Sequence, residues 1–328
     1  LVPQDHPVRA IWEFLGRLDL SAFYCSIKVV LDRPGRPASD PQVLLALWVY
    51  ATVEGIGSAR RIAKLTEEHD VYRWLRGGVP VDYHLLAEFR TTHQEEIDDL
   101  ITQAVAVLLK AGVVELKRVS QDGMRVRASA GSSSFHRDRS LEKCLEEARE
   151  QVKRVADERE HPDREASDRE QAARERAARE RGQRVQEALG QLPRVQQIKE
   201  RQKKHAGKAR AARVTEARVS TTDPSARVMK MADGGFRPGY NIQYATDTDS
   251  QVIVGVDVSN RGTDQGQALG MEEQVERRTG KQPESYLVDG GFVDLEDIKV
   301  MEQRGIEVYA PPRDKGVREA SHSQGIAG

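Results

Sequence analysis

The sequence has few cysteines, no long apolar run and almost no net charge, and each of these features excludes a class of protein. Cys25 and Cys144 are the only cysteines among 328 residues. Their wide separation in the sequence differs from the cysteine spacing of a disulfide framework, a zinc motif or a redox motif. No apolar run approaches the ~20 residues of a membrane span, and the start, LVPQDHPVRAIW, lacks the charged-then-apolar pattern of a signal peptide. We therefore expect a cytoplasmic protein without a membrane partner.

The chain has almost no net charge, so net charge alone cannot make it bind nucleic acid. Lys and Arg number 51, against 52 Asp and Glu. An affinity for nucleic acid would have to come from local clusters of basic residues. The chain is long enough for two domains, each with its own core.

Residues 1–112 carry closely spaced helix signals. Asp40, Ser58 and Asp82 each precede an apolar-rich run and predict helix starts, and Gly77 predicts a helix end. Short helices joined by tight turns are typical of a helix-turn-helix module. The stretch is therefore predicted to be an all-α domain.

Residues 137–218 are rich in Arg, Glu and Ala and are predicted to be a helical insertion. Apolar residues repeat there at spacings of four and three, in two sets: Leu141, Leu145, Ala148, Val152 and Val155, and then Val185, Leu189 and Leu192. Two packed helices or one long hairpin, broken at His161 and Pro162, would bury both sets. Residues 181–218 hold 11 basic and 3 acidic residues, which either line a DNA path or are simply solvated.

The rest of residues 113–328 alternates between strand and helix patterns. Residues 119–128 read as a strand with Met124, Val126 and Ala128 on one face. After the insertion come two strands joined as a hairpin, a helix, a strand, a helix and a last strand. The predicted fold class is α/β, a mixed sheet interrupted once by the helical insertion and preceded by the all-α domain.

Two aspartates of this sheet are candidate metal ligands. Asp122 lies within the first strand, in SQDGMRVR, and Asp289 follows the strand SYLV. Central strands of an α/β sheet can bring such residues together from remote sequence positions. Neighbouring carboxylates repel each other unless a cation lies between them, and Mg²⁺ prefers carboxylate oxygens. Turn chemistry is the alternative for Asp289, since Asp before glycine is common in turns. Asp257 is interpreted as solvated, and Asp264 as the cap of the following helix.

Basic residues of the helical domain are candidate phosphate contacts: Arg60, Arg61, Lys64, Arg73, Arg76 and Arg90. The alternative is that they simply form the solvent-exposed face of a helical bundle. Metal ions held by Asp122 and Asp289 would suit phosphoryl transfer, and such a domain in the same chain favours contacts with DNA phosphates.

Several motifs resemble the DDE transposases of bacterial insertion sequences. They are VSQDGMRVRAS, DPSARVMKMADGGFRPGYNIQYATDTDSQVIVGVDVS and YLVDGGF, and VDYHLLAEFR resembles part of the helical DNA-binding segment that precedes the catalytic domain. The resemblance implies an RNase H-like fold with a helical insertion. It also implies Asp122 and Asp289 as the first two members of an acidic triad, Mg²⁺ or Mn²⁺ as cofactor, double-stranded DNA as substrate, and a homodimer.

The third acid of the triad is the point where the sequence departs from the resemblance. In the family it is a glutamate on a helix after the fifth strand. Beyond Asp314 the only acid is Glu319, in a tail without helical periodicity. The expectation is therefore a C-terminally truncated transposase. It would cleave DNA and transfer strands, or, as the alternative, act only as a catalytically incomplete DNA-binding protein or inhibitor. A nuclease or resolvase on the same fold is a third reading.

Overall fold

The computed structural model describes residues 2–25, 27, 39–160, 168–205, 214 and 216–311. The chain divides into two compact units, one of Leu1–Glu115 with Arg278–Gly280 and one of Leu116–Arg277 with Lys281–Gly328. Within the described ranges, no helix is both long enough and apolar enough to cross a membrane.

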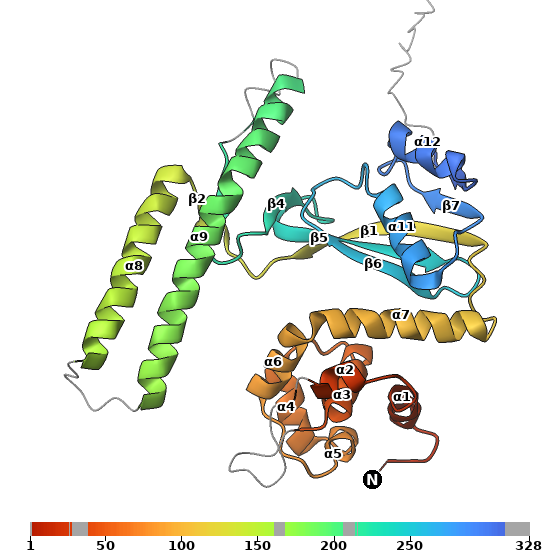
Figure 1. Ribbon diagram of the computed structural model, residues 1–328, viewed down its shortest axis with the longest axis horizontal. Helices are drawn as coiled ribbons and strands as arrows, with labels where there is room; N and C mark the ends of the chain where they lie inside the picture. Colours follow the sequence, from red (N-terminus) through yellow and green to blue (C-terminus); the bar gives the residue numbers. More distant parts are fainter. Residues whose placement is uncertain are drawn as a thin grey trace, which may run out of the picture. The chain divides into compact units, whose positions relative to one another are not determined.

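The first unit is built from helices (Figure 1). In chain order they are α1 (Pro7–Leu15), α2 (Ser21–Cys25), α3 (Pro41–Val53), α4 (Ala59–Glu68), α5 (Asp70–Arg76), α6 (Tyr83–Thr92) and α7 (Gln94–Lys110). α3 is central, because its side chains are buried on every side, Leu44, Leu47 and Ala51 among them. Trp48 of α3 donates a hydrogen bond to the backbone oxygen of Leu86 in α6, at 3.1 Å, which ties these two helices together.

The predicted helix starts of this unit are confirmed. Asp40, Ser58 and Asp82 each accept a hydrogen bond from a backbone N–H in the first turn of α3, α4 and α6. These caps satisfy donors that the helix itself leaves unpaired. Gly77 ends α5 in the left-handed conformation at φ 57°, where glycine has no Cβ penalty.

The second unit contains a mixed sheet, as the alternating pattern predicted, but with six strands instead of the five expected, because Arg227–Lys230 forms an additional strand. The six strands are β1 (Arg118–Arg127), β4 (Arg227–Lys230), β5 (Phe236–Asp247), β6 (Ile253–Ser259), β7 (Ser285–Val288) and β8 (Glu307–Tyr309). The order across the sheet is β4-β5-β1-β7-β8, with β6 also paired to β5. β5 runs antiparallel to β1, whereas β7 is parallel to β1 and β8 is parallel to β7. β1 is therefore an inner strand.

One face of the sheet is covered by helix α11 (Ala268–Thr279). A Cβ on Gly255 of β6 would lie 2.7 Å from the sulfur of Met271 and 3.1 Å from Val275, so the helix rests directly on the strand. After β7, α12 (Leu295–Gln303) is tied to α11 because Arg304 pairs with Glu272, at 2.6 Å, and with Glu276.

The opposite face is open within the described residues. Met124 and Val126 of β1 do share a face, as predicted, and each is exposed. Val258 of β6 is paired with Ile242 of β5, which is paired with Met124, so Val258 lies on the same face and is exposed too.

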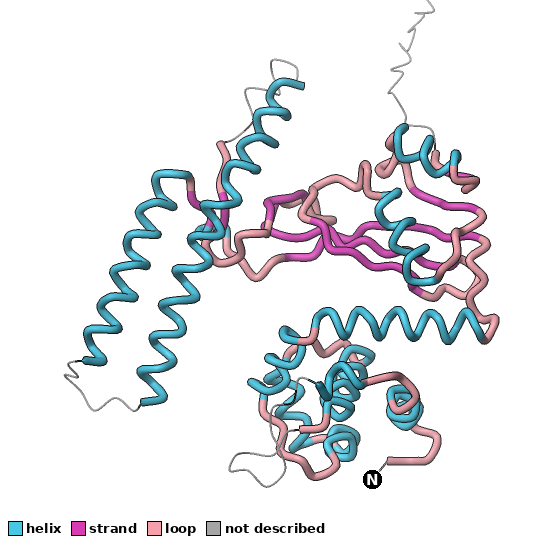
Figure 2. The backbone as a smooth tube through the Cα atoms, viewed as in Figure 1, coloured by secondary structure: helices cyan, strands magenta, loops and turns pink. Residues whose placement is uncertain are grey.

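The insertion after β1 is a hairpin of two packed helices, α8 (Asp138–Glu160) and α9 (Asp168–His205), which run side by side in Figure 2. The predicted apolar seam is confirmed at Leu141, Val185 and Leu192, which are buried. His161 and Pro162 lie outside the described residues. At the base of the hairpin, β2 (Phe135–His136) pairs with β3 (Val219–Ser220), a closure that the sequence pattern did not predict.

The close approach of α11 to β6 gives a testable stability difference. Gly255→Val should lower the free energy of unfolding by about 1–3 kcal/mol, because the new side chain overlaps Met271 and Val275. Gly190→Ala on α9 is the control: no described atom lies within 4 Å of the added Cβ, so it should raise stability by about 0.5–1 kcal/mol. Urea denaturation measures both. Wild-type stability in Gly255→Val would contradict the helix placement.

Candidate active site

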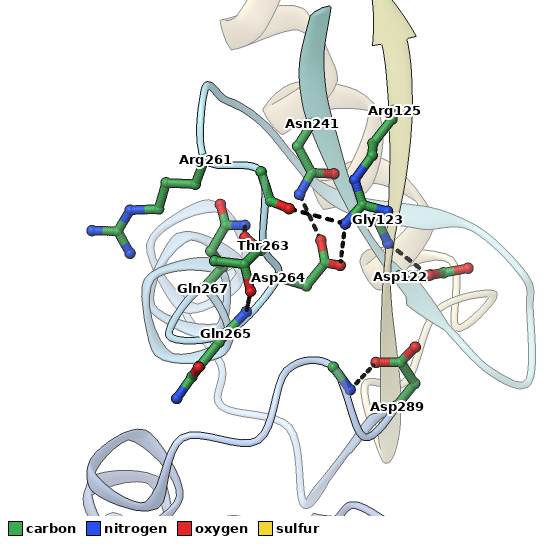
Figure 3. A network of polar contacts seen from close by, with 12 residues as sticks. Asp122, Gly123, Arg125, Asn241, Arg261, Thr263, Asp264, Gln265, Gln267 and Asp289 are labelled. Carbon is green, nitrogen blue, oxygen red and sulfur yellow. Dashed lines mark hydrogen bonds and ion pairs between the residues drawn. The ribbon is translucent and has the colours of Figure 1, made fainter. Parts of the chain in front are cut away.

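Asp122 and Asp289 occupy neighbouring positions on two adjacent inner strands. The parallel pairing of β1 and β7 aligns Gln121 with Val288 as its last pair. Asp122 is the next residue of β1 and Asp289 directly follows the last residue of β7, and both are exposed. Figure 3 shows them next to each other beside β1. Residues far apart in the sequence are thus brought together where a ligand can reach them.

Local backbone groups hold one oxygen of each carboxylate. The N–H of Gly123 donates to Asp122 Oδ1, and the N–H of Gly291 donates to Asp289 Oδ1, both at 2.7 Å. Asp122 Oδ2 and Asp289 Oδ2 have no hydrogen-bond partner in the part of the chain that the structure describes. Each carboxylate therefore keeps one oxygen available to a cation or to water.

The carboxylates of Asp122 and Asp289 suit a hard divalent cation, but two protein ligands are few for one ion. Mg²⁺ and Mn²⁺ take carboxylate oxygens and fill their remaining positions with waters or phosphate oxygens. Over the described ranges, no group of three or more His, Cys, Asp or Glu side chains gathers into a metal site. Glu319, the weak candidate for a third ligand, and Asp314 lie outside the described residues.

Asp264 is not the helix cap that the sequence pattern predicted. It lies four residues before the first residue of α11, and its carboxylate instead accepts hydrogen bonds from Asn241, at 2.6 Å, from Gln243, at 2.9 Å, and from Arg125, at 3.2 Å. The backbone N–H groups of Ala268 and Leu269 at the start of α11 are bound by Asp297 of α12. The cap therefore comes from another helix, which a local sequence pattern cannot reveal.

Burial raises the pKa of the Asp297 carboxyl, and its hydrogen bonds from these two N–H groups act in the opposite direction. Asp257 is exposed and accepts the neighbouring N–H of Val258 at 2.8 Å, consistent with its solvated interpretation. Asp247 accepts the N–H of Ser250 in the turn after β5.

Behind Asp122, a row of buried polar side chains crosses the inner strands. Tyr286 of β7 donates to Gln121 of β1 at 2.8 Å, and Gln121 donates to Gln243 of β5 at 2.9 Å. Gln243 in turn donates to Asp264. We call Tyr286, Gln121, Gln243 and Asp264 the polar row. The row was not predicted. The signal that could have revealed it is the polar pair Asn241 and Gln243, which lie two residues apart and therefore on the same, buried face of β5.

The candidate phosphate contacts of the first unit have mixed surroundings. Arg60, Arg61, Lys64, Arg73 and Arg90 are exposed, and Arg76 is partly buried. Lys64 pairs with Glu68 at 3.4 Å and Arg73 with Asp70 at 3.5 Å. The guanidinium of Arg60 lies 5.0 Å from the ring centre of Tyr83. Their role in DNA binding stays a prediction.

Arg90 is bound most closely to its own domain. Its guanidinium lies 4.4 Å from the ring centre of Trp48, and it donates to the backbone oxygen of Gly57 at 3.4 Å. Cation–π contacts of this kind stabilise the folded state. Arg90 therefore has a structural role that the basic-cluster interpretation did not assign.

Comparison with known protein families gives a match within the first unit. Residues 1–92 match the model of a family described as a transposase domain (DUF772), and α1 to α6 lie in the matched range. No curated protein matches the chain. The family match supports a function related to transposition.

The surroundings of Arg90 and Arg73 predict different costs of truncation. Arg90→Ala should lower the free energy of unfolding by about 0.5–2 kcal/mol, because it removes the contact with Trp48. Arg73→Ala, which breaks an exposed ion pair with Asp70, should change it by less than about 0.5 kcal/mol. Chemical denaturation of the full chain measures both values. Equal changes in the free energy of unfolding for the two variants would mean that Arg90 is simply a solvated basic residue.

Proposed function

We propose that this protein is a transposase of the DDE type, which binds the ends of a mobile DNA element and catalyses DNA cleavage and strand transfer. The observation that carries the proposal is the position of Asp122 beside Asp289, in a chain whose residues 1–92 match a transposase domain. A pair of exposed carboxylates on inner strands suits phosphoryl transfer, where positioning and charge stabilisation do most of the work.

The sheet topology supports an RNase H-like catalytic domain. Its inner strand β1 has an antiparallel neighbour, β5, on one side and a parallel neighbour, β7, on the other. The helical insertion leaves the sheet after β1, between its base strands β2 and β3. This is the arrangement that the resemblance to DDE transposases implies.

Asp122 and Asp289 would hold Mg²⁺ or Mn²⁺ through their oxygens that have no protein partner in the described part of the chain. When bound, such an ion neutralises charge on a phosphate and makes an attacking hydroxyl or water more acidic. Without a cation, the two carboxylates would repel the DNA backbone. Because both are exposed, a DNA strand can approach them from solvent.

The first unit would supply DNA binding in this proposal. α4 carries Arg60, Arg61 and Lys64 on its exposed side, while Ile62 and Leu65 face the core. This division leaves the charged side of the helix available to DNA phosphates. Because transposition joins two element ends, we propose that two copies of the chain act together.

The metal proposal predicts which aspartates matter for Mn²⁺ binding. Asp122→Asn and Asp289→Asn should each weaken Mn²⁺ binding at least about tenfold, because each removes a charged ligand. Asp257→Asn removes the same charge from an exposed position of the same sheet and should bind like the wild type. Electron paramagnetic resonance of unbound Mn²⁺ measures the affinities. Three variants with equal affinity would exclude the pair as a metal site.

The DNA proposal predicts a change in salt dependence. Replacing Arg60 and Arg61 by Ala in the full chain should make the slope of log affinity against log salt shallower by about 2, for duplex DNA of random sequence. Lys64 is left in place because it pairs with Glu68.

The matched control for this experiment replaces Arg17 and Lys110, two exposed basic residues of the same unit. It should leave the slope unchanged. Equal slopes for both double variants would mean that Arg60 and Arg61 are simply solvated.

A further inference from the structure

The polar row lies on the helix-covered face of the sheet, whereas Asp122 points to the opposite face. Gln121 and Gly123 flank Asp122 on β1, and side chains alternate between faces along a strand. In Figure 3, Asp264 and Asn241 lie across β1 from Asp122. The row is therefore no part of the metal-binding surface itself, and needs a separate explanation.

The row is buried and joins three strands to one loop. Tyr286, Gln121 and Gln243 are each at most 4% exposed. Each of its hydrogen bonds crosses from one element to the next: from β7 to β1, from β1 to β5, and from β5 to the loop before α11. A buried polar group left unpaired costs about 1–3 kcal/mol. A shift between these strands that broke the row would leave such groups unpaired and would therefore be energetically unfavourable.

Asp264 sets the direction of the row. An ionised carboxylate accepts hydrogen bonds and donates none, so Gln243 must present its N–H₂ group to it. The carbonyl oxygen of Gln243 then accepts from Gln121, whose own carbonyl oxygen accepts from Tyr286. Every donor points toward Asp264. The amide orientation of Gln243 therefore follows from the charge of Asp264. That of Gln121 follows from Gln243 and also from the backbone oxygen of Gln267, to which the Gln121 amide donates at 3.3 Å.

The row also fixes the backbone on both sides of Asp122. Gln121 belongs to it, and a Cβ on Gly123 would come within 2.5 Å of both Asp264 Oδ1 and Gln243 Nε2. Tyr286 links the same part of β1 to β7 three residues before Asp289. A slip of one residue between two strands would turn every side chain of one of them to the other face, and would separate Asp122 from Asp289.

We propose that Asp264 is a positioning residue, whose carboxylate anchors the polar row and thereby keeps Asp122 and Asp289 in register for one cation. The inference rests on the proposed metal function. Arg125, which also donates to Asp264, balances the charge of the carboxylate on the side away from the row.

The test measures Mn²⁺ affinity of the folded full chain in three variants along the row. Asp264→Asn keeps the shape but places an amide donor against either Arg125 or Gln243, and should weaken Mn²⁺ binding about 10- to 100-fold, as is typical for groups that orient metal ligands. Gln243→Leu interrupts the row and should have a similar effect. Tyr286→Phe removes only the hydroxyl and should weaken binding by a smaller factor, about two- to fivefold.

Circular dichroism and thermal unfolding confirm that each variant is folded at the temperature of the titration. Should Asp264→Asn fail to fold, Tyr286→Phe carries the test, because it changes a single atom at the far end of the row. Asp257→Asn is the matched control, an equal change of charge on an exposed residue of the sheet, and should keep wild-type affinity.

Two failures can be told apart. If Asp122→Asn binds Mn²⁺ as tightly as the wild type, the proposed metal site is wrong and the positioning role falls with it. If Asp122→Asn loses binding while Asp264→Asn, Gln243→Leu and Tyr286→Phe lose only thermal stability, the metal site stands and the positioning role is overturned.

Discussion

The parallel pairing of β1 with β7 is the contact on which the rest of the account depends. It aligns Gln121 with Val288 and so makes Asp122 and Asp289 neighbours. Local N–H groups orient each carboxylate, but they do not decide which residues of the two strands lie side by side, because a 4-residue strand such as β7 has little register preference of its own. The register is a tertiary property, set by β5 on one side, β8 on the other, and the hydrogen bonds beneath.

One face of this sheet is covered by a helix, and the other is open in the part of the chain that the structure describes. One is closed by α11, which approaches β6 closely enough that Gly255 has no room for a side chain, and it encloses a row of buried polar groups. The other carries Asp122 beside exposed apolar residues, Met124 and Val126. Hydrogen bonds buried on the closed face can hold carboxylates in place on the open one, where water and ligands would otherwise let them move.

Local chemistry explains what could be predicted from the sequence. The helix caps at Asp40, Ser58 and Asp82 depend only on residues within one helical turn. The periodicity of strands and helices follows from which of their faces is apolar. The mixed sheet, the helical hairpin and the aspartates at the inner strands could therefore be derived from the pattern. The role of Asp264 could not, because its partners on β1 and β5 are distant in sequence, and the α11 donors it was expected to bind are taken by Asp297. Arg90 shows the same limit, since charge alone does not reveal that it lies over Trp48.

The central claim is that Asp122 and Asp289 hold one divalent cation between them. Anomalous scattering from Mn²⁺ in crystals of the full chain locates such an ion directly, without any assay of activity. We expect one anomalous peak at about 2.0–2.3 Å from an oxygen of each carboxylate. A peak bound to other residues, or none at millimolar Mn²⁺, would contradict it.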